Sequence, residues 1–201
     1  MPRIGRSEQL GDGLAHVVSR GNRRQQLYFS ERDYRCYLEF VGEALGRYGV
    51  RCYAYCLMPN HLHLLLEGSQ EAISKVIWRA NGRYAQWFNR SYGLSGHVFQ
   101  GRFWSEPLES QEHLLELARY IVNNPVRAGL VEQAAEWPWS SMRAALALVR
   151  PPRFLTTGWL LAQFGRDDDS ARSRLAAFVA DGVWKPPPPR APIPVPGASP
   201  P

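Results

Sequence analysis

The sequence predicts an α+β fold, because strand-like and helix-like segments alternate along most of the chain. Residues 14–19 are typical of a strand, since they contain adjacent β-branched valines. An amphipathic helix is expected over residues 31–48. Two further strands, at 51–57 and 61–66, are close enough in sequence to form a hairpin. A chain of 201 residues has room for one such domain and an appendage.

The first helix has clear signals at both ends. Ser30 is a suitable N-cap, and Asp33 three residues later gives a variant of the capping box. Gly49 is expected to end the helix. A turn with three arginines, Arg20-Gly21-Asn22-Arg23-Arg24, joins the first strand to this region. The apolar stripe of the helix consists of Tyr34, Leu38, Val41, Leu45 and Tyr48.

Helical spacing returns after Ser69, where basic side chains lie opposite an apolar stripe. A glycine-punctuated strand or hairpin is expected over 95–103, and another helix over 111–123. Pro125 is expected to stop that helix at Asn124 or just before it.

The chain divides into three parts by composition. Residues 1–145 are expected to form the main domain, and residues 146–184 a small helical appendage. Residues 185–201 are mostly proline and cannot build a core, so we expect a disordered or polyproline-like tail.

The net charge of +6 and the pI near 9.5 favour a polyanionic partner. Arginine carries nearly all of the positive charge, since lysine occurs only at Lys75 and Lys185, and arginine binds phosphates and stacks on bases. The three cysteines do not form a secreted disulfide framework, and we find no signal peptide and no apolar run long enough to span a membrane. We therefore expect a soluble, cytoplasmic and nucleoid-associated protein, with neither a membrane partner nor a small-molecule substrate.

Two histidines flank one leucine in the segment Asn60-His61-Leu62-His63-Leu64. In a strand, His61 and His63 project from one face while Leu62 and Leu64 are buried on the other. Two adjacent imidazoles supply part of a metal site, and an oxygen ligand beside them would favour a hard divalent ion. An amphipathic strand with two polar surface residues would give the same short pattern.

No acidic residue occurs between Ala72 and Ser105, although this segment is rich in basic and aromatic residues. That composition is typical of a surface that neutralises phosphates and stacks on the bases of single-stranded nucleic acid. A solvated basic helix face above a core of aromatics is the alternative. The residues we expect to bind DNA, including those of the arginine-rich turn, are Arg20, Arg23, Arg24, Lys75, Arg79, Arg83, Arg90 and Arg102.

Tyr120 lies on the polar stripe of its predicted helix, with Asn124 one turn later. If this stripe faces the histidines, Tyr120 could act as a nucleophile and Asn124 could supply an oxygen ligand. His113 or Glu116, on the same stripe, could replace Asn124. Tyr84 is the second candidate nucleophile, but its spacing places it in an apolar stripe.

A zinc site is a competing interpretation of the histidine strand. Cys52 and Cys56 would lie on one face of the strand 51–57, so geometry alone does not exclude a site with His61 and His63. The spacing C-x3-C-x4-H-x-H differs from that of the usual structural zinc sites, and the cysteines are better explained as small buried residues.

Four motifs occur in order along the chain: Ser19-Arg20-Gly21-Asn22, Met58-Pro59-Asn60-His61-Leu62-His63-Leu64, Arg119-Tyr120-Ile121-Val122-Asn123-Asn124-Pro125-Val126-Arg127-Ala128-Gly129-Leu130 and Trp137-Pro138-Trp139-Ser140-Ser141. Together they resemble the REP-associated tyrosine transposases, members of the single-tyrosine HUH transposase superfamily. The resemblance covers about residues 14–145, and the following helical segment is similar to one in longer members.

The resemblance implies a ferredoxin-like (RRM-like) antiparallel sheet with helices on one side. It implies an enzyme that cleaves and rejoins single-stranded DNA at hairpins of repeated extragenic palindromes, with Mg²⁺ or Mn²⁺ as cofactor. Tyr120 corresponds to the family nucleophile, His61 and His63 to the paired metal ligands, and Asn124 to the polar residue that follows the tyrosine. Attack by the tyrosine would form a 5′-phosphotyrosine link and release a 3′-hydroxyl, and the reverse step would rejoin the strand.

A hairpin-binding module without strand transfer is the other functional hypothesis, because RNA-binding domains also use a ferredoxin-like sheet with exposed aromatics. Such a module has no physical need for His61, His63 and Tyr120 together, which favours the enzyme.

Overall fold

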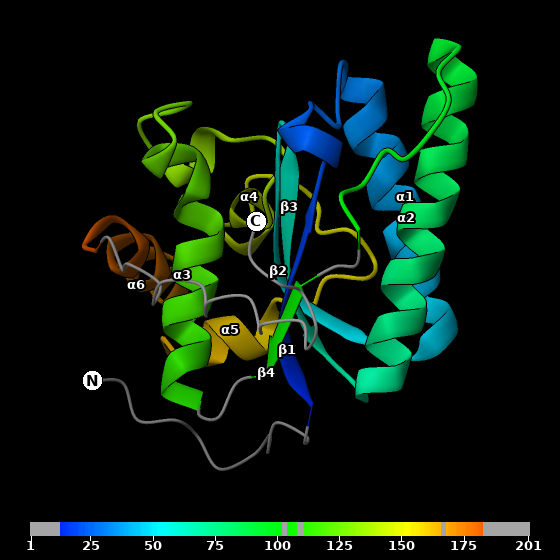
Figure 1. The fold of residues 1–201 in the computed structure, drawn as a ribbon. Helices are drawn as coiled ribbons and strands as arrows, with labels where there is room; N and C mark the ends of the chain where they lie inside the picture. Colours follow the sequence, from blue (N-terminus) through cyan, green and yellow to red (C-terminus); the bar gives the residue numbers. More distant parts are fainter. Residues whose placement is uncertain (1–12, 102–103, 108–110, 166–167, 183–201) are drawn as a thin grey trace, which may run out of the picture.

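The computed structural model describes residues 13–101, 104–107, 111–165 and 168–182. A four-stranded antiparallel sheet forms its centre, with the strands in the order β2-β3-β1-β4 (Figure 1). The α+β fold with an antiparallel sheet is therefore confirmed. The strands span Leu14–Arg20 (β1), Arg51–Met58 (β2), His61–Glu67 (β3) and Trp104–Pro107 (β4).

Helices follow the strands in a β-α-β-β-α-β-α order. The long helices are Glu31–Tyr48 (α1), Gln70–Tyr92 (α2) and Gln111–Arg127 (α3). The C-terminal helices are Met142–Ala145 (α4), Gly158–Ala162 (α5) and Asp168–Ala180 (α6). Two short 3-10 turns, Asn22–Arg24 (η1) and Ala134–Glu136 (η2), complete the described elements.

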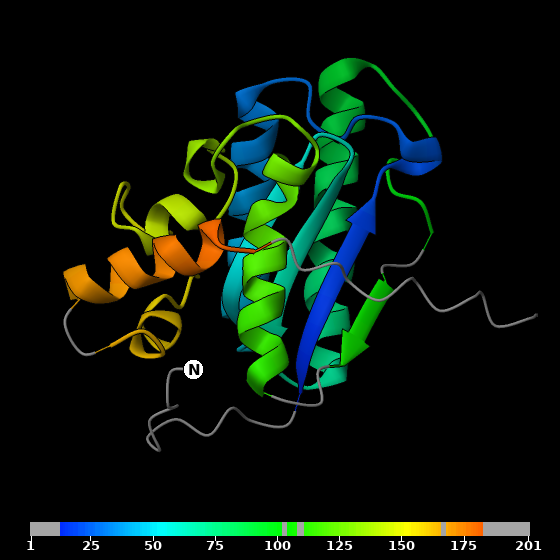
Figure 2. The ribbon, with the colours of Figure 1, turned by 90° about the vertical axis from the view of Figure 1, so that its left-hand side faces the viewer.

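Helices cover both faces of the sheet. Helices α1 and α2 lie side by side on one face, and α3 lies on the other with α4, α5 and α6 around it (Figures 1 and 2). The prediction of helices on one side describes α1 and α2, whereas the second layer was not predicted. The second layer forms because both faces of β3 are apolar. Leu64 is buried toward α1 and α2 and Leu65 toward α3, so helices must cover both faces of the sheet.

The ends of α1 match their sequence signals. The Asp33 carboxylate accepts hydrogen bonds from the backbone N–H of Ser30 (2.8 Å) and of Phe29 (2.6 Å), so the capping box is formed. Gly49 follows the helix with φ 64°, the left-handed conformation that glycine adopts without strain.

Two boundaries differ from the predictions. The last described strand of the sheet is Trp104–Pro107, whereas within the described residues 95–101 Phe99 forms only an isolated bridge to Gly21. Helix α3 continues through Pro125 to Arg127 instead of stopping at Asn124. Proline lacks the N–H that would bond to the Ile121 carbonyl. The side-chain amide of Asn124 donates to that carbonyl (3.4 Å) and to the Tyr120 carbonyl (2.9 Å), which compensates for the missing donor.

The C-terminal helices share a hydrophobic core with the sheet. Leu160 of α5 and Leu175 of α6 are buried in the same cluster as Leu65 of β3 and Ile121 of α3. The segment that we predicted as an appendage thus buries apolar surface against α3. The proline-rich tail, 185–201, lies outside the described residues.

Among the described residues, no helix combines the length and the apolar character that crossing a membrane requires.

Candidate functional site

The histidine pair lies at one end of the sheet, on the face that α3 covers. β1 pairs with β3 so that Arg20 is opposite His61 and Val18 is opposite His63. Leu62, Leu64 and Leu66 point to the α1 and α2 face, so the alternating residues His61 and His63 point to the α3 face. The rings of these two histidines are 4.9 Å apart between centroids.

Helix α3 places Tyr120 against this pair. The Tyr120 ring contacts the His63 ring edge to face, with centroids 5.7 Å apart and planes at 84°. The Arg127 guanidinium lies over the same tyrosine ring, 5.0 Å from its centroid. The structure therefore brings Tyr120 together with the histidines, as the polar stripe of α3 predicts, and adds Arg127, which we did not predict as a site residue.

Tyr84, the second candidate nucleophile, lies in the core between the sheet and helices α1 and α2. It is fully buried, and its hydroxyl donates a hydrogen bond to the Leu27 carbonyl (2.5 Å). Burial raises the pKa of this phenol far above its ordinary value, which disfavours the phenolate that attack requires. Tyr84 is a structural residue.

A third histidine, His16 of β1, belongs to the same cluster and was missed in the sequence. Its Nε2 is 2.9 Å from Nδ1 of His63, and its ring is also edge to face with Tyr120, at 6.1 Å. His16 alternates with Leu14 and Val18 along β1, and this break in an apolar strand face is the signal that could have identified it. Only the pairing of β1 with β3 shows that its partner is His63.

Asn60 connects the histidine strand to the arginine-rich turn. Its backbone carbonyl accepts from the Gly21 N–H (2.8 Å), and its side-chain amide donates to the Arg24 carbonyl (3.3 Å). Its Oδ1 is 2.7 Å from Nδ1 of His61. A carbonyl oxygen can only accept, so His61 carries its proton on Nδ1 and has a lone pair on Nε2. A Cβ at Gly21 would lie 2.1 Å from the Gln25 carbonyl oxygen, so this turn requires glycine.

Desolvation keeps the imidazoles of the cluster neutral at pH 7. Burial lowers the pKa of His16 from 6.5 to about 4. Burial, with a smaller contribution from the Arg20 charge, lowers the pKa of His61 to about 4. The pKa of His63 lies well below its ordinary value because of burial and of the neighbouring charges of His16, His61 and Arg20. Neutral imidazole is the form that binds metal ions.

The lowered pKa of His16 predicts that the stability of the metal-free protein depends on pH. Below pH 6.5 the unfolded chain binds a proton at residue 16 that the folded chain does not bind until about pH 4, so folding stability falls as the pH falls through this interval. Relative to His16→Phe, the wild type should lose about 2 kcal/mol of unfolding free energy between about pH 7 and about pH 5. Urea denaturation in EDTA at both pH values measures this, and an unchanged difference between the two proteins would contradict it.

The donor set fits a divalent metal ion. Both Nδ1 atoms are engaged, that of His61 with Asn60 and that of His63 with His16. Within the described part of the chain, Nε2 of His63 is buried without a hydrogen-bond partner. Among the described residues, no three His, Cys, Asp or Glu side chains are grouped to hold a metal. An oxygen from another residue type or from the substrate would complete a site built on His61 and His63.

Asn124 is one candidate for the third ligand on α3. Its amide nitrogen bonds to two helix carbonyls, which leaves Oδ1 able to coordinate. Glu116 is ion-paired with Arg119, which also donates to the Phe178 carbonyl of α6, so its carboxylate is already engaged. The side chain of His113 lies outside what the structure describes.

The zinc interpretation is wrong, because a bulge separates its two cysteines. The register of β2 against β3 shifts between Cys52 and Ala54. Cys52 is therefore buried on the α1 and α2 face, while Cys56 is opposite His63 on the other face. Burial raises the pKa of the Cys52 thiol to about 12, and that of Cys56 also rises, so neither is poised to form a thiolate.

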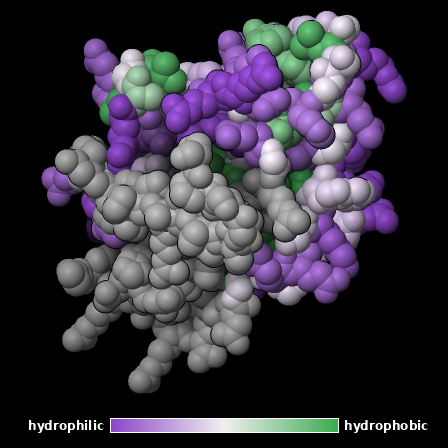
Figure 3. Space-filling model, viewed as in Figure 1, coloured by the Kyte–Doolittle hydropathy of each residue, from purple (hydrophilic) through white to green (hydrophobic). Residues whose placement is uncertain are grey.

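The predicted DNA-binding residues fall into two groups. Arg20, Arg23 and Arg24 are exposed at the histidine end of the sheet, where a hydrophilic region lies between two hydrophobic patches (Figures 1 and 3). Arg23 and Arg24 have φ values of 53° and 62°, a strained conformation that often marks functional loops. Arg90 lies in the last turn of α2, which ends at the same end of the molecule (Figure 1).

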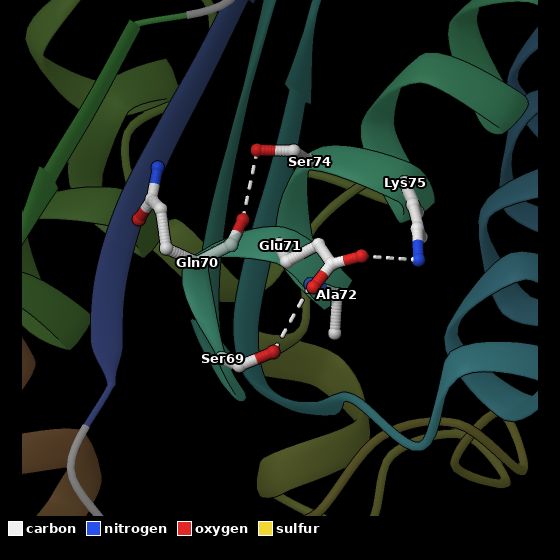
Figure 4. A network of polar contacts seen from close by, with 6 residues as sticks. All are labelled: Ser69, Gln70, Glu71, Ala72, Ser74 and Lys75. Carbon is white, nitrogen blue, oxygen red and sulfur yellow. Dashed lines mark hydrogen bonds and ion pairs between the residues drawn. The ribbon is translucent and has the colours of Figure 1, made fainter.

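The remaining predicted residues lie farther along α2. Lys75 is paired with Glu71 (2.5 Å) in the first turns of the helix, beside the Ser69 cap (Figure 4). Arg83 pairs with Glu43 of α1 and lies over the Phe40 ring, so it joins the two helices. Arg79 lies between Lys75 and Arg83 along α2. Arg102 is outside the described residues.

Comparison with known proteins gives consistent matches. The family model "Transposase IS200 like" matches residues 11–124, more than half of the chain. A Haemophilus influenzae protein named as a REP-associated tyrosine transposase is 30% identical over 122 residues, which are 51% of this chain and 69% of that protein. The REP-associated tyrosine transposase of Escherichia coli is 30% identical over 97 residues, 47% of this chain and 55% of that protein.

The fold is similar to a solved structure of a REP-associated tyrosine transposase bound to a REP hairpin. The TM-score is 0.54 at 22% identity, over 78% of this chain and 92% of that one.

Proposed function

Because this chain belongs to the IS200-like transposase family, we propose that it cleaves and rejoins single-stranded DNA at REP-type hairpins through a covalent link to Tyr120. The observation that carries this proposal is the position of Tyr120 against His63, on the face of the sheet that holds both paired histidines. A solved relative of the same fold is bound to a REP hairpin, which supports the choice of substrate.

The reaction exchanges one phosphodiester bond for another. The Tyr120 oxygen forms a bond to the scissile phosphorus while the bond to the 3′ oxygen breaks, and in net terms the phenol proton passes to that oxygen. The products are a 5′-phosphotyrosine and a free 3′-hydroxyl. The reverse attack by a 3′-hydroxyl rejoins DNA and restores Tyr120, so no external energy source is needed.

The surrounding residues lower the barrier to this exchange. His61 and His63 present the nitrogen atoms that would hold Mg²⁺ or Mn²⁺, with Asn124 as the oxygen ligand. Such an ion, when bound, acts as a Lewis acid on the phosphate. Arg127 places its positive charge over the Tyr120 ring, where it attracts the phosphate.

We assign the main DNA contacts to the exposed arginines at the histidine end, Arg20, Arg23, Arg24 and Arg90. If each neutralises one phosphate of a single strand, the slope of log K against log salt should be about −2.8, at about −0.7 per contact. Arg23→Gln should reduce its magnitude by about 0.7. Lys75→Gln serves as the matched control, because Lys75 is paired with Glu71 near the opposite end of α2.

Fluorescence anisotropy with a labelled oligonucleotide at several salt concentrations measures these slopes. Equal effects of Arg23→Gln and Lys75→Gln would contradict the assignment of the binding surface to the histidine end.

The proposed function is tested with hairpin DNA taken from repeats near the gene and labelled at either end. The DNA is incubated with Mg²⁺ or Mn²⁺ and separated on a denaturing protein gel. A metal-dependent covalent band that carries the label of the 3′-side fragment is expected, since that fragment bears the 5′-phosphate joined to tyrosine. Tight hairpin binding without any covalent band, with both metals, would instead favour a binding module.

A further inference from the structure

His16 contacts the proposed metal ligand His63 at the Nδ1 edge of its ring. The two rings are nearly coplanar, with planes at 15° and centroids 5.2 Å apart, and the His16 Nε2 to His63 Nδ1 distance is 2.9 Å. This geometry fits an in-line N–H···N hydrogen bond. Both side chains are buried, with exposed fractions of 7% and 5%. Water is therefore a poor substitute for either partner.

The hydrogen bond can hold its proton on either ring, and the two arrangements differ at the far edge of His63. If His16 donates, His63 carries its own proton on Nε2, a buried atom without a hydrogen-bond partner in the described structure. If His63 donates from Nδ1, that same Nε2 atom instead has a lone pair directed at the face covered by α3. Only the second arrangement can bind a metal ion.

We propose that His16 is a positioning residue that accepts the Nδ1 proton of His63 and so fixes the tautomer and ring orientation in which His63 binds the metal. This inference rests on the proposed function, in which His63 is a metal ligand. His16 contacts the Nδ1 edge of His63 rather than its Nε2 edge, so it supports the ligand and does not itself complete the metal site. Outer hydrogen-bond partners of this kind typically change metal affinity 10- to 100-fold.

His16 also helps to position the nucleophile. Tyr120 lies edge to face with both members of the pair, at 5.7 Å from His63 and 6.1 Å from His16, with planes at 84° in each case. The two coplanar rings thus form one continuous surface against which the tyrosine ring packs. The hydrogen bond between them therefore orients the metal ligand and the nucleophile together.

The tautomer can be read directly in the wild-type protein. In ¹⁵N NMR of histidine-labelled, metal-free protein, protonated and bare ring nitrogens resonate far apart. We expect His63 to show a protonated Nδ1 and a bare Nε2, with the assignment made from the spectrum of His63→Ala. A protonated Nε2 in the wild type would overturn the proposal without any variant of His16.

A second experiment compares the Mn²⁺ affinity of three variants. The affinity is measured by electron paramagnetic resonance without DNA. His16→Phe keeps a flat ring but cannot accept a hydrogen bond, and it should weaken Mn²⁺ binding about 10- to 100-fold. His16→Gln can accept through its side-chain oxygen and should recover most of the affinity. His97→Phe removes an exposed histidine and is the matched control, with affinity expected within about twofold of wild type.

These measurements distinguish a failure of the proposed metal site from a failure of the positioning role of His16. If His61→Ala and His63→Ala leave Mn²⁺ affinity unchanged, the proposed metal site itself fails. If those variants lose the metal while His16→Phe retains it with a wild-type spectrum, only the positioning role of His16 is overturned. If His16→Phe and His16→Gln are equally impaired, the hydrogen bond is not what His16 contributes, which also overturns the inference.

Discussion

Tyr120→Phe is expected to abolish the covalent protein–DNA product, with a loss of strand cleavage of at least about a thousandfold. The substitution removes only the oxygen that forms the bond to phosphorus. The phenylalanine ring retains the edge-to-face contacts with His63 and His16 and the position beneath Arg127. Hairpin affinity should therefore remain within about twofold of wild type, because the proposed phosphate contacts come from other residues.

Tyr84→Phe is the matched control for this experiment. It also removes one phenolic oxygen, but from a buried tyrosine whose hydroxyl donates to the Leu27 carbonyl. It should cost about 1 kcal/mol of stability and leave cleavage intact. The labelled-hairpin gel and anisotropy measure both variants. A covalent band that persists in Tyr120→Phe and disappears in Tyr84→Phe would assign the nucleophile to the other helix.

His63→Ala is expected to reduce metal-dependent cleavage by a similar factor, again at least about a thousandfold, while hairpin binding persists. The substitution removes the buried nitrogen that has no hydrogen-bond partner in the described structure, and with it one of the two proposed metal ligands. His61→Ala should have a comparable effect. The double variant should lose little more than either single variant, because two ligands of one ion act as a unit.

Single-turnover cleavage rates at several Mn²⁺ concentrations test this prediction. His97→Ala, at an exposed position, controls for the loss of a histidine as such. Loss of folding is checked by urea denaturation, because His63 is buried. Cleavage by His63→Ala at the wild-type rate and with wild-type Mn²⁺ dependence would remove this residue from the metal site.

Much of the site follows from local sequence, because its key features depend on short spacings. The alternation of a strand is enough to place His61 and His63 on one face. Helical periodicity is enough to put Tyr120 and Asn124 on one stripe of α3, and the Ser30 and Asp33 pair specifies where α1 begins. Each of these relations involves residues within a few positions of one another.

Other features depend on contacts between distant parts of the chain. Arg83, which the charge pattern includes among the DNA-binding residues, forms an ion pair with Glu43 that joins two helices, so the proposed DNA surface leaves it out. A bulge in β2 turns Cys52 away from Cys56, although ideal alternation puts them on one face. Helix α3 passes Pro125 because the Asn124 side chain takes up the carbonyl that proline leaves without a donor.

Local spacing and residue type are enough to predict the α+β pattern, the histidine pair, the polar stripe that carries Tyr120 and the resemblance to tyrosine transposases. They do not predict that Tyr120 lies against His63, that His16 is hydrogen-bonded to His63, or that α3 forms a second layer over the sheet. Strand register explains the contact between the two histidines. His16 and His63 are 47 positions apart, and the pairing of β1 with β3 alone brings their ring nitrogens within hydrogen-bonding distance.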